Sequence, residues 1–235
     1  MTQQSQQLTF DLGHRTAHGR DDFLISEANQ SAVGWIDQWP QWPAPAIILQ
    51  GPAASGKTHL TAVWRERTGA TKITPELLTK HNANELAAMG EHLHIDPVDP
   101  WIGDKDIETT LFHLYNIFKE EQRTILLTSR VAPIHINFEI ADLASRLRAA
   151  PVITIHPPDD QLLAALLVKH FSDRQLQINS DILTYLLPRM ERSFAAARDI
   201  VEQIDKLALR EKRAISIPLV RQVLLHDESQ MSFFE

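Results

Sequence analysis

Short apolar runs separated by helical patterns dominate the first two thirds of the chain. The runs fall at residues 46–49, 92–96, 124–128 and 152–155, and each is bounded by turn residues or polar stretches. Continuous apolar runs of this length predict strands buried on both faces, and the helical patterns between them predict crossover connections. The pattern therefore predicts an α/β fold in which helices sandwich a parallel sheet.

After Pro157 and Pro158 the pattern changes to helices alone. Apolar residues at helical spacing predict four helices, at residues 159–171, 181–187, 193–212 and 218–226. A small all-helical domain is therefore expected to follow the sheet.

The amino-terminal segment is polar and rich in glutamine, which predicts a flexible arm. One alternating apolar pattern, QLTFDL at residues 7–12, interrupts it. On a mobile tail, such a pattern more often docks onto a partner than into its own core. The expected organisation is an arm at residues 1–21, an α/β domain at 22–156 and a helical domain at 157–235.

The strongest chemical signal directly follows the first predicted strand. Residues 51–58 read GPAASGKT and fit G-x-x-x-x-G-K-[ST], with a helical pattern behind them. Glycines let backbone N–H groups turn toward phosphate oxygens, and the next helix adds the positive end of its dipole. We expect ADP or ATP to be held by this loop, through Gly51, Pro52, Ala53, Ala54, Ser55, Gly56, Lys57, Thr58 and His59.

The second predicted strand ends in Asp96. We expect Thr58 and Asp96 to hold Mg²⁺ beside the phosphates. In hydrolysing proteins of this architecture a second acid usually follows directly, and here that position is Pro97, which has no side-chain acceptor. Asp99 lies two residues further on, in a loop constrained by prolines. Slow turnover is therefore the simpler prediction.

Composition narrows the class of function. The chain has 235 residues and a formal charge of -7, with 23 Lys+Arg against 30 Asp+Glu. This charge argues against binding along DNA through the whole surface, so any contact with DNA is expected to be local or indirect. There is no cysteine, which excludes disulfides and thiolate chemistry, and the 11 histidines show no zinc-type spacing. The absence of a long apolar run and of a secretory signal predicts a cytoplasmic protein with no membrane contact.

Several segments give the chain a resemblance to a known family. The phosphate loop, IDPVDP at residues 95–100, ILLTS at 125–129 and DLASRL at 142–147 occur in an order similar to the AAA+ module of the bacterial replication initiator DnaA. ISIPLVRQVLL at 215–225 resembles the lid of that family. About ten residues follow the last predicted helix, so no DNA-binding domain is expected. The chain resembles the shortened Hda-like regulators, in particular the alphaproteobacterial ones.

The resemblance implies a function and a set of residues. Hda-like regulators are tethered to the sliding clamp on newly replicated DNA, contact ATP-bound DnaA and stimulate its hydrolysis. On the resemblance, Arg146 is an arginine finger that acts in trans, with Arg148 as a weaker second candidate. From spacing alone, a surface ion pair is the commoner role for such an arginine. The residues that match the clamp-binding peptide are Gln7, Leu8, Phe10 and Leu12.

Two positions depart from the family pattern. Ala195 stands where the lid has its nucleotide-sensing arginine, while Arg192 and Arg198 lie three residues to either side on the same helix face. Either could substitute, and Arg198 is preferred. Arg130 replaces the acid that often follows the first sensor strand, while Ser129 or the threonine before it remains a candidate for phosphate contact.

Three functions remain open at this level. The first is a nucleotide-gated regulatory adaptor with weak or no ATPase activity of its own. The second is an active AAA+ ATPase that loads or remodels a DNA-bound partner, against which Pro97 argues. The third, a small-molecule P-loop kinase, is disfavoured because no arginine-rich lid covers the phosphates. The choice between ADP and ATP stays open, as does homo-oligomerisation through the finger face.

Overall fold

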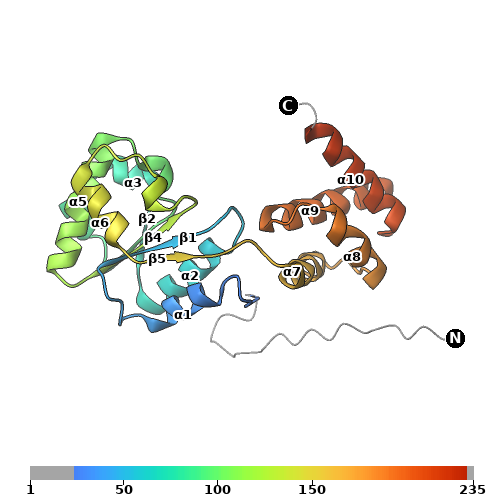
Figure 1. Ribbon diagram of the computed structural model, residues 1–235, viewed down its shortest axis with the longest axis horizontal. Helices are drawn as coiled ribbons and strands as arrows, with labels where there is room; N and C mark the ends of the chain where they lie inside the picture. Colours follow the sequence, from blue (N-terminus) through green and yellow to red (C-terminus); the bar gives the residue numbers. More distant parts are fainter. Residues whose placement is uncertain (1–23, 232–235) are drawn as a thin grey trace.

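The computed structural model describes residues 24–231. Within this range five parallel strands form one sheet in the order β2-β3-β4-β1-β5 (Figure 1). The predicted α/β fold is thus confirmed. The strands are β1 (Ala46–Gln50), β2 (Thr71–Ile73), β3 (His92–Ile95), β4 (Thr124–Ser129) and β5 (Val152–Thr154).

The edge strand β2 is absent from the sequence prediction. It has three residues and lies between the end of a helix and Pro75, so it is too short to show a periodic pattern. It pairs with β3 through Thr71↔Leu93, Lys72↔His94 and Ile73↔Ile95. This register brings Lys72 into the sheet.

Helices cover both faces of the sheet. Strand side chains alternate between the faces, so each face has apolar residues that a layer of helices buries. On β1, Ile47 and Leu49 pack in one core with residues of α1 and α2, while Ile48 packs in the opposite core with residues of α5 and α6. Helices α1 and α2 lie on one side of the sheet, and α5 and α6 lie on the other (Figure 1). The elements of this part are α1 (Gln30–Gln38), α2 (Lys57–Thr68), α3 (Pro75–Lys80), α4 (Ala83–Ala87), α5 (Lys105–Glu120) and α6 (Ala141–Ala149), with 3-10 turns η1 (Asp99–Trp101) and η2 (Pro133–His135).

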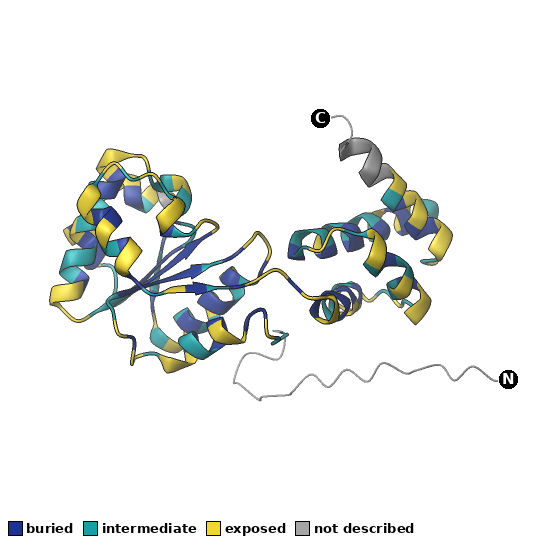
Figure 2. Ribbon diagram, in the orientation of Figure 1, coloured by how far each residue is buried: buried dark blue, intermediate teal, exposed yellow. Residues whose placement is uncertain are grey.

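Helices alone follow β5, as the sequence predicts. They are α7 (Asp160–Asp173), α8 (Ser180–Leu186), α9 (Phe194–Glu211) and α10 (Ile217–Met231), with the 3-10 turn η3 (Leu187–Arg189) between α8 and α9. Side chains at Asp159 and Ser193 cap α7 and α9 by accepting from the amides of Leu162 and Ala196. The four helices bury a core of their own (Figure 2).

Two buried side chains, with the partly buried Leu166 beside them, connect this helical lid to the sheet. Leu162 of α7 and Phe194 of α9 are buried in the cluster that also contains Ile155 and residues of α1 and α2. A backbone hydrogen bond from His156 N to the carbonyl oxygen of Ala28 lies at the same junction, with a length of 2.9 Å. The lid therefore begins on a packed contact with the phosphate-loop side of the sheet.

Candidate functional site

The phosphate loop leaves the carboxyl end of β1 and leads into α2. Gly56 caps α2 with φ at 88°, a left-handed conformation that favours glycine. Gly51 has little room for a side chain, since a Cβ there would lie 3.0 Å from both Ile155 Cβ and Ser55 Oγ. The amino end of α2 thus faces a narrow loop, an arrangement suited to an anion. His59 lies in the first turn of α2 and is half-buried.

Lys57 is folded onto the loop that precedes it. Its Nζ donates at 2.7 Å to the carbonyl oxygens of Gly51 and of Pro52, and the residue is buried. Burial lowers the pKa of Lys57, although the nearby Asp96 opposes this effect. Phosphate oxygens are stronger acceptors than neutral carbonyls. The geometry therefore fits a lysine that moves from the loop carbonyls to a phosphate.

Asp96 follows β3 and is the centre of a polar cluster. Thr128 donates to its Oδ1, while the Thr58 hydroxyl and Lys72 Nζ each lie 3.5 Å from its Oδ2. Burial opposes ionisation of this carboxyl group, but the Thr128 hydrogen bond, the charge that His94 acquires in acid and the charge of Lys72 outweigh it, so the pKa of Asp96 is lowered. The carboxylate is ionised at neutral pH.

The donor set fits magnesium. Mg²⁺ prefers hard oxygen ligands and binds through one or two protein groups together with phosphates and waters. The hydroxyl of Thr58 and Oδ2 of Asp96 provide two such oxygens at the mouth of the loop. Within residues 24–231, no cluster of three His, Cys, Asp or Glu forms a metal cage.

Ser129 and Asp99, two residues that the sequence predicts near the phosphate site, form hydrogen bonds with other groups. The buried Ser129 donates its hydroxyl to the Val131 carbonyl at 2.6 Å and accepts from the Val131 amide. Thr128, on the opposite face of the same strand, is the residue that reaches Asp96. Asp99 accepts a hydrogen bond from the amide of Arg130 at 3.0 Å. Of the two hydroxyls at the end of β4, that of Thr128 and not that of Ser129 lies at the site.

His94 lies on the same face of β3 as Asp96, with 1% of its surface exposed. Neither ring nitrogen has a hydrogen-bond partner in the structure. Burial lowers the pKa of His94 to about 4, while the charge of Asp96 opposes the shift. A neutral, buried imidazole next to the phosphate site follows.

This burial predicts a dependence of stability on pH. The unfolded chain takes up a proton on His94 near pH 6.5, whereas the folded chain does so only near 4. The unfolded state therefore binds more protons in this window, and the free energy of unfolding falls by up to about 3 kcal/mol as the pH decreases through it. Urea unfolding at pH values from 7 to 4.5 measures the slope. His94→Leu should flatten it and His113→Leu, at an exposed position, should not; equal slopes in all three proteins would disprove the assignment.

Arg146 lies in the last turn of α6 and packs on aromatic rings of α5. Its guanidinium carbon is 4.8 Å from the centre of the Phe112 ring and 5.6 Å from that of Tyr115. Its Nε is buried without a hydrogen-bond partner. None of the ion pairs found among the described residues neutralises this guanidinium.

Arg148, the second finger candidate, is used within the chain. Its guanidinium donates to the carbonyl oxygens of Pro133 and Ile136, at 3.4 and 3.2 Å. It also lies over the ring of Phe138. These contacts hold the η2 loop against α6 and give Arg148 a structural role.

Sequence reasoning missed the buried carboxylate that positions α6. Glu108 of α5 is fully buried and accepts three backbone N–H groups, from Gly103 at 2.8 Å, Glu139 at 3.1 Å and Ile140 at 2.7 Å. No side chain of its own caps α6, which begins after Ile140. Glu108 therefore acts as a long-range cap, and no local sequence pattern signals it.

The lid arginines have exposed side chains. Arg198 forms an ion pair with its neighbour Asp199 at 2.8 Å, and Arg192 pairs with Asp160 at the start of α7 at 3.1 Å. Arg198 follows Phe194 by four residues, so it shares the helix face that contacts the sheet cluster. Ala195 instead lines a cavity of about 310 Å³ on the lid. Arg192 contacts the start of α7, whereas Arg198 lies close enough to His170, near the end of α7, for its charge to add to burial in lowering the pKa of that histidine. The assignment of Arg198 to the phosphates stays a prediction.

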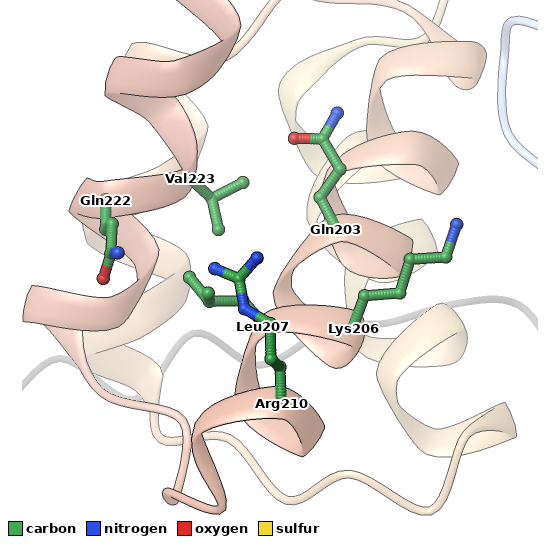
Figure 3. A pocket seen from close by; sticks show the side chains of 6 residues that line it. All are labelled: Gln203, Lys206, Leu207, Arg210, Gln222 and Val223. Atoms are coloured by element: carbon green, nitrogen blue, oxygen red, sulfur yellow. The ribbon is translucent and has the colours of Figure 1, made fainter.

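A separate hollow of about 250 Å³ lies between α9 and α10 (Figure 3). Figure 3 shows Arg210 extending from α9 toward Val223 on α10. The hollow is lined by Gln203, Lys206, Leu207, Arg210, Gln222 and Val223. This hollow shares no residue with the phosphate loop.

The clamp-peptide residues Gln7, Leu8, Phe10 and Leu12 lie outside the described residues. None of the helices in the described part of the chain combines the length and apolar character needed to cross a membrane.

Known proteins share this architecture. Residues 159–224 match the family model for the Hda lid domain. The fold is similar to domain III of the replication initiation protein DnaA from Thermotoga maritima, with a TM-score of 0.72, 17% identity and coverage of 87% of this chain and 94% of that one. It is also similar to AMPPCP-bound DnaA from Aquifex aeolicus, with a TM-score of 0.65, 21% identity and coverage of 79% of this chain. The present chain spans 64% of that protein.

The parallel sheet, the phosphate loop and the helical lid define an AAA+ P-loop module. Within that class the lid, residues 159–224, matches the Hda lid, and the whole fold is similar to that of the AAA+ domain of DnaA. The resemblance noted from the sequence is thereby confirmed.

Proposed function

We propose that this chain is a nucleotide-binding regulator of DnaA that acts in the cytoplasm. Held at the DNA sliding clamp by its amino-terminal peptide, it stimulates ATP hydrolysis by DnaA and so represses re-initiation of chromosome replication. The observation that carries the proposal is the Hda-type lid combined with a DnaA-type AAA+ fold.

Nucleotide binding is supported by the loop and by similar structures. Two of these are DnaA proteins bound to AMPPCP. In this chain the loop, Lys57 and the amino end of α2 would bind the phosphates of ADP or ATP, and Arg198 would reach them from the lid. Thr58 and Asp96 would hold Mg²⁺, which neutralises phosphate charge when it is bound.

Two features support the regulatory role: the expected slow hydrolysis by this chain and the guanidinium of Arg146. Pro97 provides no acceptor for an attacking water, and the carboxylate of Asp99 is bound to the Arg130 amide. Slow hydrolysis by this chain is expected. Arg146, with its guanidinium on Phe112 rather than on a carboxylate, is suited to enter the nucleotide site of DnaA in trans. No feature of the described site favours the alternative of an active loader or remodeller.

Clamp tethering is carried by the sequence of the arm. Gln7 would occupy a polar pocket while Leu8, Phe10 and Leu12 anchor in an apolar groove of the clamp. Burial of two such side chains contributes several kcal/mol, on the order of 1.5–3 kcal/mol each.

A clamp-retention assay tests the proposal. The Leu8→Ala/Phe10→Ala protein should lose at least about tenfold in retention on the clamp, together with clamp-dependent stimulation of DnaA. Gln3→Ala/Gln4→Ala, in the same arm but outside the peptide, is the control and should behave as wild type. Unchanged retention of the first variant refutes the tether. Rapid ATP hydrolysis by the isolated chain, without clamp or DnaA, would support the ATPase alternative instead.

A further inference from the structure

A lysine lies against the carboxylate of the predicted magnesium site. Lys72 Nζ is 3.5 Å from Asp96 Oδ2, the same oxygen that the Thr58 hydroxyl approaches at 3.5 Å. Lys72 pairs with His94 across β2 and β3, and His94 precedes Asp96 by two residues, so all three side chains lie on one face. The oxygen available to a metal ion therefore already has a cation beside it.

This ion pair contributes little to folding. Its N–O distance is long, and the Lys72 side chain is 36% exposed, so solvent screens the attraction. Lys72 also lies on a three-residue edge strand, and its side-chain hydrogen bond within the described residues is the one to Asp96. The charge of Lys72 acts instead on any ion or phosphate that binds next to Asp96.

The other charges around the loop also make the site positive without a metal ion. The charge of Arg130 acts on Lys57 and that of Lys72 on Asp96, while the carboxylates that act on Lys57 are those of Asp96 and Asp99. The Asp99 carboxylate is already bound to a backbone amide. The phosphates of a nucleotide would therefore meet a cationic site before any metal arrives.

We propose that Lys72 supplies, at Asp96, part of the positive charge that Mg²⁺ otherwise brings, so that a nucleoside diphosphate binds this site with little dependence on Mg²⁺. Two cations that share one carboxylate oxygen repel each other, so the resident ammonium weakens metal binding. The same ammonium can donate to a phosphate oxygen as a mobile point charge. This inference rests on the proposed nucleotide site and describes how that site is controlled.

Calorimetric titration of the full chain with ADP, in EDTA and in saturating Mg²⁺, tests the inference. Wild type should change its affinity by less than about threefold between the two conditions, because the lysine and the metal substitute for each other. Lys72→Met should bind about tenfold more weakly than wild type in EDTA and recover in Mg²⁺. Lys72→Arg keeps the charge and should resemble wild type. The matched control is Lys119→Met at the end of α5, near the amino ends of the strands.

Each other outcome decides a different question. If Lys72→Met and wild type respond equally to Mg²⁺ while both bind ADP, the inference is wrong and the nucleotide site stands. If Lys72→Met does not recover in Mg²⁺, or if Lys72→Arg behaves like Lys72→Met, the exchange of lysine for metal is refuted. If wild type binds no ADP in either condition, the proposed nucleotide function itself fails.

Discussion

Replacement of Arg146 with alanine is expected to lower the stimulation of DnaA ATP hydrolysis by about 10³-fold. A guanidinium beside a γ-phosphate neutralises charge that develops in the transition state. In the free protein this group rests on the ring of Phe112, a contact that at a partly exposed position costs only about 0.5–1 kcal/mol to break. It can therefore leave α5 for a phosphate without abandoning an ionic partner.

Single-turnover hydrolysis by ATP-bound DnaA, with clamp and DNA present, measures this effect. Nucleotide affinity and clamp retention of Arg146→Ala should equal those of wild type, since Arg146 packs on α5 and belongs neither to the phosphate loop nor to the predicted clamp peptide. Arg146→Lys should stay impaired, because lysine lacks the planar fork of donors. Arg221→Ala removes an exposed arginine of the lid and serves as the control. Stimulation that persists in Arg146→Ala would show that another group completes the DnaA site.

Replacement of Lys57 with alanine is expected to weaken ADP binding by at least about 100-fold. The ammonium lies 2.7 Å from two loop carbonyls and would exchange both for phosphate oxygens, which form stronger, charge-assisted bonds. Two such bonds account for a loss of about 3–4 kcal/mol.

The same calorimetric titration measures the loss, with Lys119→Ala as a control that changes charge equally at a distance from the loop. Circular dichroism should show an unchanged helix content, since Gly56 and the α2 cap do not depend on the lysine. Wild-type affinity in the variant would mean that the loop does not hold the phosphates through Lys57.

The sequence predicted those parts of the fold that are encoded locally. Four buried strands of β-branched and leucine residues, and four lid helices, have periodic patterns long enough to recognise. The strand β2 was missed because its three residues, Thr71 to Ile73, cannot show a period, and its place in the sheet depends on pairing with β3. Lys72 was missed with it.

The difference between local patterns and long-range contacts also explains which site residues could be predicted from the sequence. The phosphate loop has a fixed spacing, so its residues could be proposed from the sequence. The choice between Thr128 and Ser129 depends on which face of β4 meets the loop, and only the register of the sheet determines it. Asp99 is two residues from Pro97 in sequence, yet its carboxylate is bound to the amide of Arg130. Contacts over long sequence distances decided both cases.

The buried carboxylate of Glu108 has a consequence for motion. The amides of Gly103, Glu139 and Ile140 all bind to it, so they can exchange with solvent only when it leaves its place. One of these amides lies beyond the turn that follows Asp96, and two lie at the start of the helix that carries Arg146. The loop at Gly103 and the start of α6 are therefore expected to open together, because both depend on this one carboxylate.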